Sequence, residues 1–407
     1  MTGSVWRPLV DGASARPSST RRHPVPADPT APSGPVAVLG GTGVVGRAAV
    51  RMLTRLGVDA VRVGARRVDS ARQQHDSPGV DWRRVDADDP DSLADFCAGT
   101  RLVLNCAGPS YLLADRVARA ALAAGSDYVD VSGDGPAYQL LDGSPLLDGS
   151  RTAVLSAGML PGLANVVPRV LADDLTGAKL VVYAGGIEPF GPASAGDLAL
   201  SLDSSDATDG DGHWYGETLA AWVGGQRRRH ALPVREDVEV AGFPGRVTTM
   251  PFLTADAERL ARSTGLDELH WHNVFVGNAL RLTLSRLRGR VSPAPAALAA
   301  ITAEIAAAAE LDLTGLDPFY LMAITLHRAD RIHTAVLRTH SSFELTAATA
   351  AHTVQAVLSG AVAPGLHYAD DVLDPRGLLD AVAALGALPV FHTHRHAHDE
   401  PMEVGSL

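Results

Sequence analysis

Lysine, cysteine and aromatic residues are scarce in this 407-residue sequence. Lys179 is the single lysine, so any mechanism that needs a catalytic lysine has one candidate. The two cysteines, Cys97 and Cys106, are too few for a disulfide framework or a cysteine metal site. Cys106 is interpreted as a small buried residue, because no cation or histidine lies near it in sequence to activate its thiol.

Long apolar runs and an excess of basic residues are also missing. No segment approaches the length of a membrane span, and the formal net charge of −11 disfavours nucleic acid or an anionic membrane as a partner. Residues 1–34 are rich in Pro, Ser, Arg and Asp without hydrophobic periodicity, which predicts a disordered leader. We therefore expect a soluble, cytoplasmic protein that takes a small-molecule substrate.

The most informative segment that is present begins at Val36. Four apolar residues predict a buried strand, and glycines spaced as G-x-G-x-x-G then precede a helix over 48–56. A dinucleotide-binding turn requires this order: Gly41 allows the turn, Gly43 lets the backbone approach a pyrophosphate, and Gly46 lets the helix pack on the strand. The turn residues expected to bind the cofactor are Gly40, Gly41, Thr42, Gly43, Val44, Val45 and Gly46.

The next short strand, 60–65, ends at Arg66 and Arg67. An enzyme that prefers NAD usually has Asp or Glu at this place to bind the ribose 2′-hydroxyl. Guanidinium groups suit a 2′-phosphate instead, because they donate forked, charge-assisted hydrogen bonds. The pair predicts NADP(H) as the cofactor; the alternative is two solvated surface arginines. A Tyr-x-x-x-Lys pair of the short-chain dehydrogenase type is excluded, because Leu175 occupies the position of its tyrosine.

Four further short apolar strands are predicted over 80–85, 101–105, 128–131 and 152–156. Because they alternate with helices, they predict a doubly wound, Rossmann-type parallel sheet covered on both faces, with ligands beyond the carboxyl ends of its strands. An acidic residue after the third strand commonly meets the adenine edge, and a loop of small residues allows close approach of a nicotinamide ribose or forms a simple strand-ending turn. The cofactor-binding residues expected at these ends are Asp86, Ala87, Cys106, Ala107, Gly108, Pro109, Ser132 and Gly133.

The pattern changes after about residue 158. Longer segments with alternating apolar residues predict a second α+β domain with a mixed, largely antiparallel sheet, whose strands span 179–187, 245–252, 270–276 and 331–339. An alanine-rich helix is predicted over 293–311.

The resulting domain organisation has five parts. We expect a leader over 1–34, an NADP-binding domain over 35–157, a substrate and dimerisation domain over 158–340, a segment packing back on the first domain over 341–388, and a flexible tail over 389–407. The tail holds four alternating histidines, interpreted as solvated rather than metal-binding because nothing around them fixes a geometry. They are His392, His394, His396 and His398.

Four motifs, taken in order, resemble the saccharopine dehydrogenase-like NAD(P)-binding family. They are Val38–Gly46, Asn105–Pro109, Asp127–Asp134 and Ala157–Asn165. The segment 364–371 resembles the family's C-terminal segment, and 180–340 is similar in architecture. After Gly133 the family more often has Glu, where this chain has Asp134.

The resemblance implies a two-domain, NADP(H)-dependent oxidoreductase with its cofactor at the cleft and a second domain that often forms a homodimer. It implies hydride exchange with a carbon–nitrogen bond of a small polar metabolite, typically an imine formed from an amine and a keto or aldehyde acid. Two alternatives stay open: an enoyl reductase that acts on a carbon–carbon double bond, and a non-catalytic NADP-sensing regulator.

The residues expected to supply a proton are Tyr111, which follows the Gly-Pro turn, and His213 and Tyr215 further along the chain. For His213, an exposed loop histidine is the favoured interpretation over a proton donor. Since an iminium acceptor is already protonated, the absence of a sharp acid–base constellation fits imine chemistry.

Other polar residues receive structural interpretations. His270 and His272 alternate on a predicted strand and are assigned to sheet packing, and Asp130 and Asn165 are assigned to holding loops together. If the substrate bears carboxylates, the cations available in the second domain are Arg227, Arg228, Arg229, Arg235 and Arg246.

Overall fold

The structure is a computed structural model that describes residues 34–68, 80–203, 216–329 and 331–397. The first sheet has seven strands in the order β16-β6-β5-β4-β1-β2-β3, and all neighbouring strands are parallel. The strands are β1 (Val36–Leu39), β2 (Val61–Ala65), β3 (Val80–Arg84), β4 (Leu102–Asn105), β5 (Asp127–Asp130), β6 (Thr152–Leu155) and β16 (Gly365–Tyr368). The predicted Rossmann-type sheet is confirmed.

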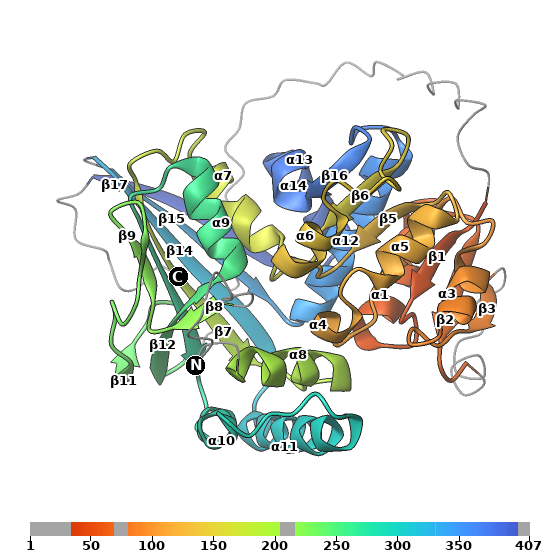
Figure 1. The fold of residues 1–407 in the computed structure, drawn as a ribbon. Helices are drawn as coiled ribbons and strands as arrows, with labels where there is room; N and C mark the ends of the chain where they lie inside the picture. Colours follow the sequence, from red (N-terminus) through yellow and green to blue (C-terminus); the bar gives the residue numbers. More distant parts are fainter. Residues whose placement is uncertain (1–33, 69–79, 204–215, 330, 398–407) are drawn as a thin grey trace, which may run out of the picture. The chain divides into compact units, whose positions relative to one another are not determined.

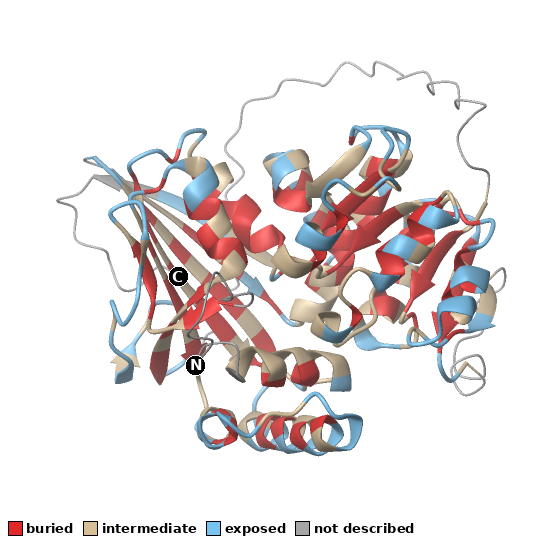
Figure 2. Ribbon diagram, in the orientation of Figure 1, coloured by how far each residue is buried: buried red, intermediate tan, exposed pale blue. Residues whose placement is uncertain are grey.

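Helices cover both faces of this sheet, which explains why its strands are nearly continuous apolar runs. Val36 and Val38 pack toward α1 and α12, whereas Ala37 and Leu39 pack toward α3 and α5 on the other face. Figure 2 shows the central strands buried along their length. The helices of this part are α1 (Val44–Arg55), α3 (Pro90–Cys97), α4 (Ser110–Leu113), α5 (Arg116–Ala123), α6 (Gly135–Leu141) and α12 (Ser342–Leu358).

The second sheet is mixed, as predicted. Its central path runs β10-β9-β13-β7-β14-β15-β17, with β13 and β7 parallel and the other pairs antiparallel. β12 pairs with β11, β13 and β8. The strands are β7 (Lys179–Ile187), β8 (Gly216–Thr218), β9 (Ala221–Val223), β10 (Arg227–Arg228), β11 (Arg235–Glu239), β12 (Arg246–Thr254), β13 (Glu268–Phe275), β14 (Phe319–Arg328), β15 (Arg331–Thr339) and β17 (Val390–Ala397).

Two groups of helices accompany this sheet (Figure 1). α7 (Leu163–Leu171) and α9 (Ala255–Thr264) join its core, whereas α8 (Pro192–Asp203), α10 (Ala279–Leu287) and α11 (Pro295–Leu313) form a separate apolar cluster. The N-cap of α9 is Thr254, whose hydroxyl accepts the Ala257 N–H. The C-cap is Gly265, which lies in the left-handed region. Sequence thus fixes the ends of the helix that carries Asp256 and Arg259.

The C-terminal part returns to the first sheet. β16 pairs with β6, α12 packs against α1, and α13 (Ala369–Val372) and α14 (Pro375–Ala384) follow β16. The expected flexible tail is wrong for residues 390–397, which form β17. This strand pairs with β15 and satisfies the backbone groups of its edge.

The tail histidines are therefore partly ordered. His392 and His394 lie exposed on β17, and His398 lies outside the described residues. Among the described residues, no group of three or more His, Cys, Asp or Glu side chains has a geometry suited to a metal ion. None of the helices in these ranges combines the length and apolarity that a bilayer span needs.

Candidate active site

The backbone of the turn between β1 and α1 packs so closely that several of its glycines have no room for a Cβ atom. A Cβ at Gly46 would lie 2.3 Å from the Gly40 carbonyl oxygen, so the predicted close packing of helix on strand is present. The left-handed residue of the turn is Gly40, with φ +75°. Gly41 is needed for another reason, since its Cβ would lie 2.4 Å from Cγ1 of Val63.

The N-terminus of α1 fits a dinucleotide pyrophosphate. Gly43 is the N-cap, no side chain in the described residues caps the helix, and its first turn, which includes Val44 and Val45, has no acidic residue. The backbone N–H groups and the helix dipole are thus directed at an incoming anion. Arg47 holds the turn from behind, because its Nη1 donates to the Thr42 carbonyl at 2.7 Å.

Arg66 and Arg67 follow β2 directly, at the carboxyl edge of the sheet. Both are exposed, and neither has a hydrogen-bond or ion-pair partner among the described residues. The next strand along this edge leads to Asp86, whose Oδ1 accepts the Asp88 N–H at 3.1 Å, and to the half-buried Ala87. These residues lie where the sheet edge would meet the adenosine half of NADP(H).

The ends of β4 and β5 are joined through one buried carboxylate. Asp130 accepts hydrogen bonds from Asn105 Nδ2 at 3.0 Å, from the Tyr128 hydroxyl and from the Ser132 N–H at 2.9 Å. Asn105 in turn accepts the Ala107 N–H at 3.0 Å. Asp130 is 3% exposed and holds the two loops, in line with its sequence interpretation.

Cys106 lies at the same edge and remains a thiol. Burial, together with the charge of Asp130, raises the pKa of Cys106 well above its usual range. A thiolate nucleophile is therefore disfavoured at neutral pH, as the sequence indicated.

A cleft of about 460 Å³ separates these strand ends from the second sheet. The predicted residues that line it are Val45, Cys106, Ala107, Gly108, Tyr111, Ser132 and Gly133. At Gly108 a Cβ would lie 3.1 Å from Ala193 Cβ, and a Cβ at Gly196 would lie 2.6 Å from Pro109 Cγ. The small residues of this loop thus permit close approach of α8, a role that the sequence did not indicate.

Asp197 of α8 anchors the short helix α4 across the cleft. Its Oδ1 accepts both the Ser110 N–H at 2.7 Å and the Ser110 hydroxyl at 3.0 Å. Burial raises the pKa of Asp197 to about 6, against the lowering effect of these hydrogen bonds. This contact fixes the backbone beside Tyr111, the one predicted proton donor within the described residues; His213 and Tyr215 lie outside them.

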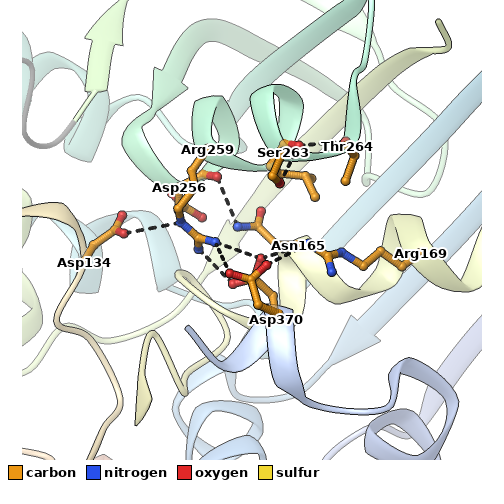
Figure 3. Close-up of polar contacts among 10 residues, drawn as sticks. Asp134, Asn165, Arg169, Asp256, Arg259, Ser263, Thr264 and Asp370 are labelled. Carbon is orange, nitrogen blue, oxygen red and sulfur yellow. Dashed lines mark hydrogen bonds and ion pairs between the residues drawn. The ribbon is translucent and has the colours of Figure 1, made fainter. Parts of the chain in front are cut away.

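A charged cluster lies beside the cleft, where α9 and the residues after β16 meet the loop after β5 (Figure 3). Arg259 of α9 makes two hydrogen bonds to Asp370, Nη2–Oδ1 at 2.8 Å and Nη1–Oδ2 at 3.1 Å, and its guanidinium lies 3.7 Å from the Tyr368 ring centroid. Arg169 of α7 contacts Asp371 at 3.2 Å and Asp370 at 3.6 Å. Asp370 is 1% exposed, so these contacts neutralise a carboxylate that has no access to water.

Two further carboxylates of the cluster line the cleft with little compensation. Asp134 Oδ1 lies 3.9 Å from Arg259 Nε, and Asp256, only 6% exposed, has an Oδ2 without a hydrogen-bond partner in the described residues. Burial and the neighbouring charge of Asp256 raise the pKa of Asp134 to about 7, although Arg259 opposes this. Burial likewise raises the pKa of Asp256. Around neutral pH, one proton is therefore available at this wall of the cleft.

Several residues considered from the sequence lie elsewhere. His272 stacks on Tyr183 with ring centroids 4.8 Å apart, and His270 contacts Glu268 at 3.1 Å; both lie on the sheet face opposite Trp271 and Asn273, which line the cleft. The five arginines weighed as carboxylate ligands are not among the cleft residues; Arg227, Arg229 and Arg246 make ion pairs, and Arg228 and Arg235 are exposed. The arginines that line the cleft are Arg281 and Arg288.

The seven-stranded parallel sheet and the turn after β1 define a dinucleotide-binding fold. Residues 36–145 match the family model described as Saccharopine dehydrogenase NADP binding domain. This part of the chain is therefore similar to the NADP-binding domain of saccharopine dehydrogenases, and the cofactor is NADP(H), the one predicted from Arg66 and Arg67.

Two known proteins illustrate how far the similarity extends. A probable mitochondrial saccharopine dehydrogenase-like oxidoreductase of Arabidopsis thaliana is 46% identical over 50 residues, which is 12% of this chain and 11% of that protein. The apo saccharopine dehydrogenase (L-Glu forming) of Saccharomyces cerevisiae has a TM-score of 0.62 at 16% identity, with 90% of this chain and 100% of that one covered. The first match spans about a tenth of the relative, and the second shows the fold.

Proposed function

We propose that this protein is an NADPH-dependent oxidoreductase that reduces, or in reverse oxidises, a carbon–nitrogen bond. The observation that carries the proposal is the excess of carboxylates at the wall formed by Asp134 and Asp256; the arginines of the cleft, Arg281 and Arg288, belong to α10 and the residue after it. Asp370 and Asp371 already engage Arg169 and Arg259, which leaves the charges of Asp134 and Asp256 largely uncompensated. A protonated imine or an ammonium group supplies the positive charge that such a pair favours.

The charges of the cluster distinguish this substrate from a carbon–carbon double bond. Reduction of an enoyl group places negative charge on the substrate, and carboxylates that face that charge raise its energy. Reduction of an imine proceeds through a cation, and the same carboxylates lower its energy. Because the cluster excludes much water, these effects exceed those at an exposed surface.

The protonation state of Asp134 is compatible with this chemistry. NADPH, when bound, supplies a hydride. Asp134 in its protonated form donates a proton to the imine nitrogen, and the carboxylate that remains, together with Asp256, stabilises the iminium. In the oxidation direction the Asp134 carboxylate accepts the proton that the iminium releases. Its pKa of about 7 suits both directions near neutral pH.

Other residues of the chain hold the cofactor. The turn at Gly40–Gly46 and the N-terminus of α1 would hold the pyrophosphate, and Arg66 with Arg67 would hold the 2′-phosphate. Cys106, Ala107, Ser132 and Gly133 line the cleft beyond the carboxyl ends of β4 and β5, where a nicotinamide ring would reach the carboxylates.

The proposal includes the homodimer and the cytoplasmic location that the sequence suggested. Light scattering coupled to size-exclusion chromatography tests the dimer, with a mass of twice 42.4 kDa expected. Fractionation of the source cells tests the location, for which the Arabidopsis relative carries the contrasting description "mitochondrial".

The activity is tested by following NADPH absorbance with two substrate panels. One panel holds preformed cyclic imines and amine plus oxo-acid mixtures, and the other holds enones and enoyl thioesters. We expect oxidation of NADPH with members of the first panel. Turnover confined to the second panel would favour the enoyl reductase, and tight NADPH binding without turnover in either would favour an NADP sensor.

A further inference from the structure

We propose that the substrate of this cleft joins its nitrogen to an extended apolar chain or ring system, which lies along β12 away from Asp134 and Asp256. This inference rests on the proposed function and adds the class of substrate to it. The sequence alone suggested a small polar metabolite, and the residues that line the second half of the cleft point to a different molecule.

The strand β12 connects the charged end of the cleft to its apolar end. Asp256 follows the last residue of this strand, Thr254, and the residues of the strand that line the cleft are Thr254, Phe252 and Met250. Alternate residues of a strand share one face at about 3.3 Å per residue, so the row from Thr254 to Met250 extends about 13 Å. Thr254 is the polar residue of this row, and the two residues farther from Asp256, Phe252 and Met250, are apolar.

The neighbouring elements continue the apolar lining. Trp271 and Phe275 come from the adjacent strand β13, Leu198 comes from α8, and Leu284 comes from α10. Trp271 is 1% and Leu284 is 5% exposed, and both belong to the hydrophobic clusters that pack around the second sheet. A polar substrate body placed here would lose its hydration without gaining hydrogen bonds in return.

Polar side chains also line this end of the cleft, mostly from α8, β8 and α10; they are Ser201, Thr218, Arg281, Ser285 and Arg288. Asn273 pairs with Met250 across β12 and β13, and its amide has no hydrogen-bond partner among the described residues. Arg288 is exposed and donates to the Thr218 hydroxyl at 3.3 Å. The apolar surface is therefore the face that β12 and β13 share, where Asn273 offers a hydrogen-bonding group between Met250, Phe252, Trp271 and Phe275.

Equilibrium binding of n-alkylammonium ions tests this directly, because these ions carry the charge and the chain without reacting. Butyl-, hexyl- and octylammonium are titrated calorimetrically into the full-length protein saturated with NADP⁺, alongside carboxylates of matched length. We expect the dissociation constant to fall about fourfold per added methylene, and therefore about 16-fold per pair, the ratio given by about 0.8 kcal/mol per buried CH₂.

The substitution Met250→Glu locates the effect. It places a charge in the apolar half, and we expect the length dependence to drop below twofold per pair of methylenes. The matched control is Leu282→Glu on α10, since Leu282 is 50% exposed and does not line the cleft; this variant keeps the full length dependence. Thermal unfolding of both variants checks that they fold.

Two readouts separate this inference from the proposed function. A dissociation constant independent of chain length in the unaltered protein would overturn the apolar substrate, whatever Met250→Glu does. Alkylcarboxylates that bind as tightly as alkylammonium ions would contradict the role of Asp134 and Asp256 and hence the proposed function, even with the length dependence intact.

Discussion

The two sides of the cleft bind by different physical means. The nucleotide side uses backbone N–H groups of a single turn, and what matters there is the space left by missing side chains, as at Gly46. The opposite side uses the charges of carboxylates and guanidinium groups from several separate elements (Figure 3). The glycine turn is therefore sensitive to substitutions that add side-chain volume, whereas the charged cluster is sensitive to substitutions that remove or add a charge.

The largest effect is expected from Arg259→Leu on the charged side. The substitution removes both hydrogen bonds of Arg259 to Asp370, which is 1% exposed, and leaves only the 3.6 Å contact of Arg169; removal of one partner of a buried ion pair typically costs about 3–5 kcal/mol. Urea unfolding measures the loss. Arg51→Ala serves as control, because its ion pair with Glu344 is exposed and contributes about 0–1 kcal/mol. Equal losses in both variants would show that the cluster is not a buried ion-pair network.

The next effect concerns the proton. Asp134→Asn is expected to lower the rate of imine reduction by about 10²–10⁴-fold, the usual contribution of a general acid. Stopped-flow NADPH oxidation measures it. The matched comparison is Tyr111→Phe, which removes the other candidate hydroxyl beside the cleft. A full rate in Asp134→Asn together with a comparable loss in Tyr111→Phe would transfer the role to Tyr111.

The same group sets a pH dependence. Because its pKa is raised to about 7, Asp134 keeps its proton up to that pH and loses it above. The reduction rate is therefore expected to be level below pH 7 and to fall about tenfold per pH unit above it, with the reverse trend for amine oxidation. A profile measured for Asp134→Asn should lack this inflection; an unchanged profile would assign the inflection to another group.

A smaller effect is expected on the nucleotide side. The double substitution of Arg66 and Arg67 by Ser removes charge-assisted hydrogen bonds worth about 1.5–3 kcal/mol each, so NADPH affinity should fall by at least tenfold. NADH lacks the 2′-phosphate, and its affinity should change by less than about twofold. Fluorescence titration of both nucleotides gives the ratio. Equal losses for the two would remove the arginines from phosphate recognition.

The smallest effect is expected from His272→Phe. Burial lowers the pKa of His272 to about 4, so its ring is neutral at pH 7 and packs on Tyr183 away from the cleft. A phenyl ring preserves that packing, so kcat/KM and its pH dependence should stay within about twofold. A substantial loss of activity with an unchanged melting temperature would show that His272 takes part in the chemistry.

The contrast between the two sides also explains what the sequence could reveal. The β1 turn and the ends of β2, β4 and β5 are contiguous motifs whose backbone geometry is local, so the Rossmann-type sheet and the NADP(H) preference were predictable. The positive φ of Gly40 was not predicted, because a run of adjacent glycines does not show which one adopts positive φ. Strand β17 was missed because its alternating histidines, with Thr393 and Arg395 between them, resemble a solvated segment.

The charged cluster was beyond the reach of sequence reasoning. Asp134, Asp256, Arg259 and Asp370 come from segments more than a hundred residues apart at the widest, and their proximity arises only when α9 and the residues after β16 meet the β5 loop. One signal did exist: Asp134 occupies the position after Gly133 where the resembling family more often has Glu. An acidic residue is thus shared at the carboxyl end of β5, but its burial and partners required the structure.

The most direct test of the central claim follows the hydride itself. NADPH carrying deuterium at the transferable C4 position is incubated with the protein and an alkyl-substituted cyclic imine, and the product is analysed by mass spectrometry and NMR. The account predicts one deuterium on the carbon bonded to nitrogen, with a yield that collapses in Asp134→Asn. Deuterium found only on the β-carbon of an enoyl compound supplied in parallel, with none beside nitrogen, would contradict it.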